Sequence, residues 1–223
     1  MTLPNPRLIS NVTGIPDIAW YLVSGKLSAE DIVGILRKND VDLYALKSVL
    51  DFGCGCSRVT RHMFKLENSM IHGVDVDRKA VEWCQAHLSR GHFKFCNKMP
   101  LLDYPDSQFD LVYALTVFTH LTTDLVIGWI EELRRVITPG GYLIFTTMGE
   151  TFIQALSKTE RLQFLRGSPV VKIPKYSGNN LCRAYHPYEF VSTELVKGFT
   201  LVDFSPGGAK GTPGQDLYLF RKK

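Results

Sequence analysis

The sequence predicts an α/β fold whose central layer is a mostly parallel sheet. Along residues 48–145, short apolar segments alternate with amphipathic ones. That alternation is typical of strand–helix–strand units with parallel strands. Two more strand-like segments, 199–204 and 216–221, close the chain around a loop rich in proline and glycine. Together with five earlier strands, they make a sheet of seven.

Length and composition fit one globular domain. The chain has 223 residues, of which 45% are hydrophobic and 22% charged, as is ordinary for soluble proteins. No apolar run reaches the roughly 18 residues of a membrane helix. The N-terminus carries no apolar segment behind basic residues, so it does not resemble a signal peptide. We therefore expect a cytoplasmic protein with no membrane partner.

Charge and cysteine content narrow the function further. The formal net charge is +4, and the basic residues form scattered pairs rather than a run, which makes a nucleic-acid partner unfavourable. The five cysteines are odd in number and include no C-x-x-C pair. Cys54 and Cys56 are too close in sequence for paired zinc ligands. We expect five free thiols and no metal site.

Five strands are predicted in the first two thirds of the chain, because each is a short apolar run next to turn residues. In open parallel sheets, ligands bind outside the carboxyl ends of the strands. The functional residues are therefore expected just after residues 52, 74, 95 and 114. The predicted strands are 48–52, 70–74, 93–95, 109–114 and 142–145.

Helices are predicted between these strands. Residues 58–66 have helical spacing, and residues 77–88 begin at Asp77, a favourable N-cap. Residues 123–137 carry an apolar face, and Pro139-Gly140-Gly141 is expected to stop that helix. Near the N-terminus, Ser28-Ala29-Glu30-Asp31 has the pattern of a helix start. Tyr185-His186-Pro187 is expected to open a helix through Leu195.

The single domain then has four parts. Residues 1–46 form a helical N-terminal cap, and residues 47–148 form the ligand-binding core. Residues 150–197, here called the insertion, separate the fifth strand from the last two and are expected to form a lid. Residues 198–223 form the closing strand pair.

The strongest motif lies between residues 49 and 58. A strand ends at Phe52, glycines at 53 and 55 turn the chain, and a helix begins, which lets a ligand approach the backbone closely. A lone G-x-G is also typical of a plain structural turn. Asp75 closes the next strand 22 residues after Gly53, where a carboxylate accepts hydrogen bonds from a ribose diol. The third glycine of the dinucleotide pattern would stand at position 58, which is arginine; this favours an adenosine ligand without a pyrophosphate.

These residues resemble the class I S-adenosylmethionine-dependent methyltransferases over about residues 48–148. Asp51, Gly53 and Gly55 match the family's first motif, and Ser57 replaces its third glycine. The resemblance implies a Rossmann-like, doubly wound seven-stranded sheet whose final strand is antiparallel. It also implies S-adenosylmethionine as cofactor and methyl transfer as activity.

The resemblance assigns the cofactor site residue by residue. The loop after the first strand would wrap the methionine end, Asp75 would bind the ribose, and Val76 would lie beside the adenine. Residues after the third and fourth strands would complete the adenine side. The full set is Asp51, Phe52, Gly53, Cys54, Gly55, Arg58, Asp75, Val76, Asn97, Lys98, Met99, Leu115 and Thr116.

The sequence indicates the methyl acceptor less clearly than the cofactor. Residues 114–118 read Ala-Leu-Thr-Val-Phe, not the Asp/Asn-Pro-Pro-Tyr of enzymes that methylate adenine or glutamine, and no Pro-Cys pair offers a nucleophile for cytosine. We expect a small-molecule partner, methylated on a hydroxyl or amine, such as a secondary metabolite or sugar. His120 and His186 are candidate bases because histidine titrates near neutral pH, and Tyr185 would join them. A structural role stays open for each.

Two other functions are compatible with the motif. A non-catalytic subunit that binds S-adenosylmethionine would carry the same loop. A nicotinamide-dependent oxidoreductase would share the sheet, although Arg58 speaks against it.

Overall fold

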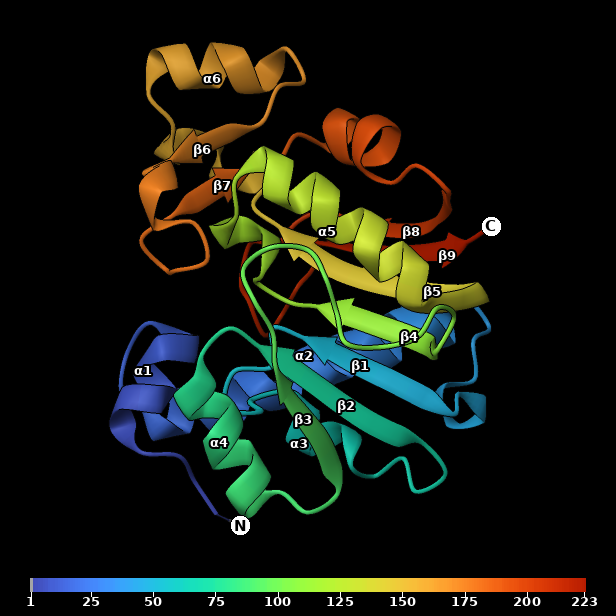
Figure 1. Ribbon diagram of the computed structural model, residues 1–223. Coiled ribbons are helices and arrows are strands. Elements are labelled where there is room, and N and C mark those ends of the chain that lie inside the picture. Colours follow the sequence, from blue (N-terminus) through green and yellow to red (C-terminus); the bar gives the residue numbers. More distant parts are fainter. Residues whose placement is uncertain (1) are drawn as a thin grey trace.

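The computed structural model describes residues 2–223 and contains a seven-stranded sheet with helices on both faces (Figure 1). Its strand order is β3-β2-β1-β4-β5-β9-β8, and β9 is antiparallel to both of its neighbours. The predicted fold class is confirmed. The strands are β1 (Ser48–Phe52), β2 (Met70–Asp75), β3 (Gly91–Phe95), β4 (Phe109–Ala114), β5 (Ile137–Thr147), β8 (Phe199–Ser205) and β9 (Asp216–Lys222).

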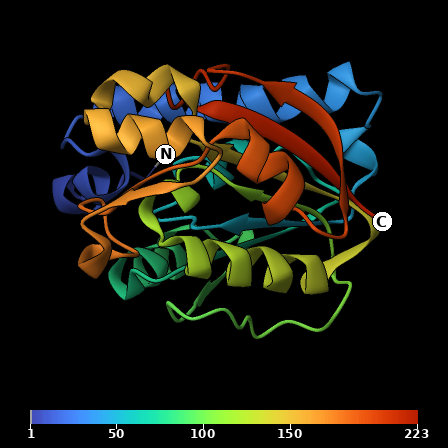
Figure 2. The same ribbon diagram turned by 90° about the horizontal axis from the view of Figure 1, so that it is seen from above.

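Both faces of the sheet are buried. Val49 of β1 packs in a cluster with residues of α2 (Ile18–Lys38), whereas its neighbour Leu50 packs with residues of α5 (Thr123–Val136). Successive side chains of a strand point to opposite faces, so α2 and α5 cover opposite sides of the sheet (Figure 2). This double burial explains why β1 is apolar nearly throughout.

The N-terminal segment forms α1 (Pro6–Thr13) and α2. The predicted helix start at Ser28 is wrong, because α2 begins at Ile18 with Asp17 as its N-cap. Asp31 instead accepts hydrogen bonds from the backbone N–H groups of Lys210 (2.8 Å) and Gly211 (3.1 Å). Aspartate is common at helix N-caps, but Asp31 instead binds a loop 180 positions further along the chain.

Two of the predicted helix boundaries also need correction. The helix expected over 58–66 is only α3 (Thr60–Met63); Ser57 before it has a φ of 61°, outside helical geometry. Pro139-Gly140-Gly141 does not end α5, since the helix stops at Val136 and all three residues lie inside β5. In contrast, α4 (Arg78–His87) begins as predicted, with Asp77 accepting from the N–H groups of its first turn.

The connection between β3 and β4 contains no helix, contrary to the regular alternation read from the sequence. Its position is fixed instead by α5. Glu132 accepts a hydrogen bond from the N–H of Leu102 (2.6 Å), and Arg135 donates to the carbonyl oxygens of Leu102 (3.1 Å) and Tyr104 (2.8 Å). These contacts satisfy backbone groups that a helix would have paired internally.

The insertion stands over the carboxyl ends of β4 and β5, on the same side as α1 (Figure 1). It holds η3 (Glu150–Ala155), α6 (Lys158–Leu165), β6 (Val170–Lys172), η4 (Pro174–Tyr176), β7 (Arg183–Tyr185) and the π-helix η5 (Phe190–Leu195). β6 and β7 pair as a small antiparallel sheet. Tyr185 ends β7 and does not open a helix, but the predicted helix through Leu195 is present and begins directly after Pro187, at Tyr188. None of the helices within residues 2–223 combines the length and the apolarity needed to span a membrane.

Candidate functional site

The loop after β1 turns through three left-handed residues at alternate positions. Gly53, Gly55 and Ser57 have φ angles of 83°, 51° and 61°. Glycine adopts this conformation freely, whereas a residue with a Cβ is destabilised in it by about 1–2 kcal/mol. The spacing read from the sequence thus marks a real backbone requirement, and Ser57 meets it at an energetic cost.

Two valine side chains pack closely against the glycines of this loop. A Cβ on Gly53 would overlap the side chain of Val117, which follows β4, and a Cβ on Gly55 would overlap Val12 of α1. Both positions therefore exclude larger residues for steric as well as conformational reasons. Val12 is a site residue that sequence reasoning missed, because nothing in α1 marks it.

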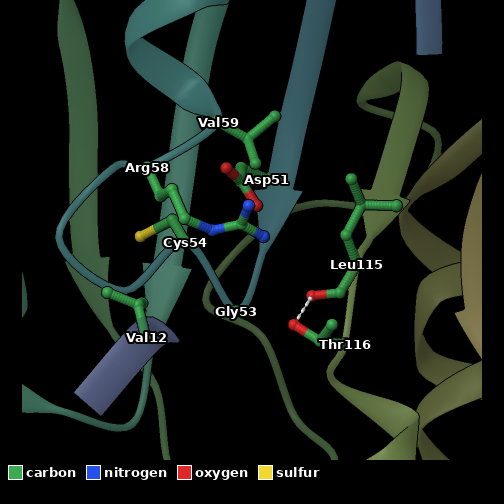
Figure 3. Close-up of a pocket in the computed structure, with 8 residues that line it drawn as sticks. All are labelled: Val12, Asp51, Gly53, Cys54, Arg58, Val59, Leu115 and Thr116. Carbon is green, nitrogen blue, oxygen red and sulfur yellow. Dashed lines mark hydrogen bonds between the residues drawn. The ribbon is translucent and has the colours of Figure 1, made fainter. Parts of the chain in front are cut away.

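A pocket opens at the carboxyl ends of β1 and β4 (Figure 3). Six of the eight residues that line it are among those predicted from the sequence, whereas Val12 and Val59 are not. Its walls are Val12, Asp51, Gly53, Cys54, Arg58, Val59, Leu115 and Thr116. The loop after β1 and the turn after β4 thus form one site, as the parallel sheet requires.

Arg58 and Asp51 point toward each other in this pocket (Figure 3). Arg58 is 6% exposed, and its guanidinium donates to Ser28 Oγ of α2 (3.2 Å). A Cβ on Gly25 of α2 would overlap the carbonyl of Arg58. Glycine at that position lets α2 lie directly on the loop, so the N-terminal helices help to build the site.

The carboxyl of Asp51 is buried at the floor of the pocket. It accepts a hydrogen bond from Thr60 Oγ1 (2.6 Å). Burial raises its pKa to about 7, although this bond and the charge of Arg58 act in the opposite direction. Asp51 is therefore poised to change its charge near neutral pH.

Asp75 joins the end of β2 to the glycine loop. Its Oδ2 accepts from the N–H of Gly55 (2.7 Å), and its Oδ1 accepts from the N–H of Asp77 (2.7 Å). Burial raises the pKa of this carboxyl, while the two backbone bonds oppose that rise. Asp75 and the adjacent Val76 remain partly exposed at the sheet edge, where a ligand can reach them.

Phe52 and residues 97–99 lie around the pocket rather than in it. The Phe52 ring packs against Trp129 of α5, with centroids 4.6 Å apart, and so points into the core. Asn97 lines a second pocket with Val74 and Tyr104. Met99 is 66% exposed, and the carbonyl of Lys98 accepts from Trp129 Nε1 (3.2 Å). Residues 97–99 follow β3 at the same edge of the sheet, and neither they nor Phe52 line the first pocket.

The turn after β4 is strained. Thr116 has a φ of 63°, which is rare for a β-branched residue and is destabilising by about 1–3 kcal/mol. Its N–H donates to Thr146 Oγ1 of β5 (2.9 Å), and its carbonyl accepts from Thr119 Oγ1 (2.9 Å). Such strain, held in place by neighbouring residues, is typical of functional sites.

His120 stands four residues further on and binds the insertion. Its Nδ1 lies 2.8 Å from the carbonyl oxygen of Cys182. Its own carbonyl accepts from the N–H of Gly178 (2.8 Å), and Ser177 Oγ accepts from the N–H of Thr122 (3.1 Å). Burial lowers the pKa of the His120 imidazole. The structure thus places His120 between the turn after β4 and the insertion.

His186 and Tyr185 lie elsewhere in the insertion. His186 has no exposed surface, neither ring nitrogen has a hydrogen-bond partner, and burial lowers its pKa to about 4. Tyr185 is 2% exposed, in a cluster with Leu156 and Phe164. Neither residue lines the pocket at β1 and β4.

All five cysteines are buried, unpaired thiols. Burial raises the pKa of each thiol. The pKa of Cys56 rises to about 11 and that of Cys96 to about 12. Over the part of the chain that the structure describes, no three potential ligands are grouped so that they could hold a metal ion.

The sheet order and the glycine loop are those of Rossmann-like α/β proteins. A family profile described as a methyltransferase domain matches residues 50–145. The chain is 22% identical over 192 residues to a ubiquinone biosynthesis O-methyltransferase of Coxiella burnetii, covering 83% of this chain and 79% of that protein. It is 30% identical over 101 residues to 27-O-demethylrifamycin SV methyltransferase of Amycolatopsis mediterranei, covering 43% and 36%.

Solved structures share the fold. An S-adenosylmethionine-dependent methyltransferase of Mesorhizobium loti superposes with a TM-score of 0.63 at 15% identity, over 85% of this chain and 96% of that one. Residues 50–145 thus match the methyltransferase-domain profile, and the sheet has the fold of S-adenosylmethionine-dependent methyltransferases. These matches support methyltransferase activity with S-adenosylmethionine as the cofactor.

Proposed function

We propose that this enzyme transfers the methyl group to a hydroxyl of a small molecule and that His120 is the general base. The observation that carries the proposal is the contact between His120 Nδ1 and the carbonyl of Cys182. A carbonyl oxygen only accepts hydrogen bonds, so Nδ1 must carry the proton. Nε2 of the neutral ring then holds a free lone pair.

The surroundings of His120 support a role as base. Its pKa is lowered by burial, so the ring is neutral at neutral pH and able to take up a proton. Its Nε2 makes no hydrogen bond and is not among the buried unpaired atoms, which leaves it accessible. His120 also follows the strained Thr116 by four residues, on the turn that borders the pocket.

The pocket offers charges that fit the cofactor. Asp51 at its floor suits the ammonium of the methionine end, and Asp75 retains oxygen lone pairs for the ribose hydroxyls. The backbone of residues 53–55 would lie along the cofactor, with Leu115 and Thr116 opposite. Val76 and residues 97–99 would border the adenine at the same sheet edge.

The bound cofactor supplies an electrophilic methyl carbon. The residues of this chain would hold the acceptor hydroxyl in line with it and exclude water. His120 Nε2 would take the proton of the acceptor hydroxyl as the methyl group leaves the cofactor sulfonium, which would depart as the neutral thioether, and would pass that proton to solvent. The Cys182 carbonyl stabilises the imidazolium that forms in between.

A hydroxyl acceptor is favoured over an amine for two reasons. A neutral amine is already a nucleophile and needs little help from a base, whereas a hydroxyl must lose its proton. The two curated relatives described above also carry O-methylation in their names. The insertion, with Tyr185 and His186, would form the acceptor side, because it is bound to His120 at Gly178 and Cys182.

The experiment is incubation with labelled S-adenosylmethionine and fractions of small molecules, followed by mass spectrometry of the labelled product. We expect the label on an oxygen atom. His120→Gln should lower turnover at least 100-fold, in the range of general-base catalysis, with cofactor affinity unchanged. His92→Gln, at an exposed position on β3, is the control. Label on a nitrogen, or full activity of His120→Gln, contradicts the proposal.

A further inference from the structure

Buried polar atoms without partners gather at one corner of the sheet. Thirteen buried side-chain nitrogen and oxygen atoms within residues 2–223 lack a hydrogen bond, and six belong to five residues at the carboxyl end of β5 and the start of β9. Each such atom destabilises a folded protein by about 1–3 kcal/mol. The atoms are Thr147 Oγ1, both ring nitrogens of His186, Gln215 Oε1, Asp216 Oδ2 and the Tyr218 hydroxyl.

The sheet register brings these residues together. Thr147 of β5 lies directly opposite Asp216 of β9, and Tyr218 stands two residues further on the same face. The N–H of His186 donates to the carbonyl of Met148 (2.9 Å), which places His186 beside the end of β5. We call Thr147, His186, Gln215, Asp216 and Tyr218 the polar corner.

The polar corner is next to the cofactor edge. β5 is the neighbour of β4 in the sheet. Thr146, adjacent to Thr147, accepts the hydrogen bond from the N–H of Thr116, which lines the pocket. The acceptor must approach the methyl donor along this same edge. The corner therefore lies at the carboxyl edge along which an acceptor would approach, on the α5 face of the sheet, because the Thr147 side chain points away from that of Thr146.

The chemistry of the corner matches neutral hydroxyl groups. Asp216 Oδ2 and Gln215 Oε1 accept hydrogen bonds, while the Thr147 and Tyr218 hydroxyls both donate and accept. An anion would be repelled by Asp216, which forms no ion pair with any described residue. A cation would leave the donors unpaired. Burial raises the pKa of Asp216 to about 6 and the charge of Glu150 adds to the rise, while the hydrogen bond from the N–H of Gly207 and the nearby Tyr218 hydroxyl oppose it.

Aromatic rings border the corner on its outer side. Tyr188 is 37% exposed, and its ring lies 4.6 Å from that of Phe204. Phe204 in turn stacks on Tyr218 at 4.7 Å. Aromatic side chains offer a flat apolar surface with little loss of conformational entropy. Such a wall suits the C–H face of a sugar ring.

We propose that the polar corner is an acceptor subsite that binds the hydroxyl groups of a neutral, sugar-like polyol. The inference rests on the proposed hydroxyl methylation and names the class of its substrate. Because the corner atoms are buried, η3 and Tyr188 must move aside when the ligand enters, as active-site covers do. The ligand would then pair the groups that the free enzyme leaves unpaired.

The test is saturation-transfer NMR on enzyme saturated with S-adenosylhomocysteine. The ligands are methyl glycosides of neutral hexoses, with glucosamine and glucuronate as charged comparisons. We expect signals from neutral glycosides, weakened at least fivefold in Thr147→Val and Tyr218→Phe. The melting temperature of each ligand-free variant is measured alongside, because Tyr218 lies against both Thr147 and Asp216 and its loss can also affect folding. Ser48→Ala, which removes a buried unpaired hydroxyl at the start of β1, should bind as wild type.

Three results would overturn the subsite. These are no signal from neutral glycosides, signal only from the charged sugars, or variants that melt earlier yet bind normally, which indicates a structural role. Failure of the proposed function would show differently. In that case the glycosides would bind through the corner, but no oxygen atom would gain the label.

Discussion

The carboxylate of Asp75 accepts a 2.7 Å hydrogen bond from the backbone N–H of Gly55. The contact ties the end of β2 to the left-handed loop after β1, so one side chain orders the loop and also faces the ligand edge. Its second oxygen is bound by the N–H of Asp77. If the proposed cofactor site is correct, the cofactor meets a carboxylate that is already held in place, which reduces the entropy lost on binding.

Asp75→Ala should weaken the binding of S-adenosylhomocysteine at least tenfold. The change removes charge-assisted hydrogen bonds to the ribose, each about 1.5–3 kcal/mol, and loosens Gly55. Calorimetric titration measures the effect. Glu67→Ala removes an exposed carboxylate that precedes β2, at the opposite end of the strand from Asp75, and should leave the affinity unchanged. Equal affinity of Asp75→Ala and wild type would remove Asp75 from the cofactor site.

The affinity for S-adenosylhomocysteine should rise with pH between 6 and 8. Burial raises the pKa of Asp51 to about 7 in the free protein, so the carboxyl is mostly protonated at pH 6 and mostly ionised at pH 8. An ammonium binds the ionised form, which lowers the pKa in the complex. The gain should approach roughly tenfold and level off above pH 8.

Asp51→Asn separates this titration from others. The asparagine keeps the shape of the side chain and its contact with Thr60 but cannot ionise. We expect weaker binding with a flat dependence between pH 6 and 8. A slope that persists in Asp51→Asn would assign the titration to another group.

Gly55→Ala should lower the free energy of unfolding by about 1–3 kcal/mol. The new Cβ meets the left-handed backbone, with a φ of 51°, and overlaps Val12. Urea denaturation measures the loss. Val12→Ala in the same chain should recover the steric part but not the conformational part. Strictly additive effects in this double-mutant cycle would show that Val12 does not pack on Gly55.

The five thiols should react with a thiol reagent only after unfolding. All are buried, and burial raises the pKa of each, so little thiolate is accessible in the native state. Titration in denaturant without reductant should find five thiols per chain. Fewer than five would reveal a disulfide, and fast reaction of native protein would contradict the burial of Cys54 and Cys56.

The strands could be predicted because hydrophobic patterning and burial coincide. β1, β2 and β4 are apolar runs covered on both faces, and each was located to within a residue. The errors fall where tertiary contacts override local preference. Asp31 has the composition of a helix cap but binds a distant loop. Residues 96–108 lack a helix because α5 satisfies their backbone instead.

The candidate site divides in the same way. Gly53, Gly55 and Asp75 are recognisable because left-handed turns and strand-end carboxylates restrict the residue type. Val12 is not recognisable from the sequence, because an apolar residue on a helix that only packs in the core would look the same. Nor does the sequence show that Cys182 fixes the tautomer of His120, since the residues are 62 apart and the contact uses a backbone carbonyl.

Calorimetric titration of the wild-type enzyme with S-adenosylhomocysteine and with NAD, under the same conditions, tests the central claim most directly. The loop with Ser57 and Arg58 in place of further glycines, followed by Asp75, predicts saturable one-to-one binding of S-adenosylhomocysteine and no measurable binding of NAD. Tight binding of NAD, with none of S-adenosylhomocysteine, would contradict the account.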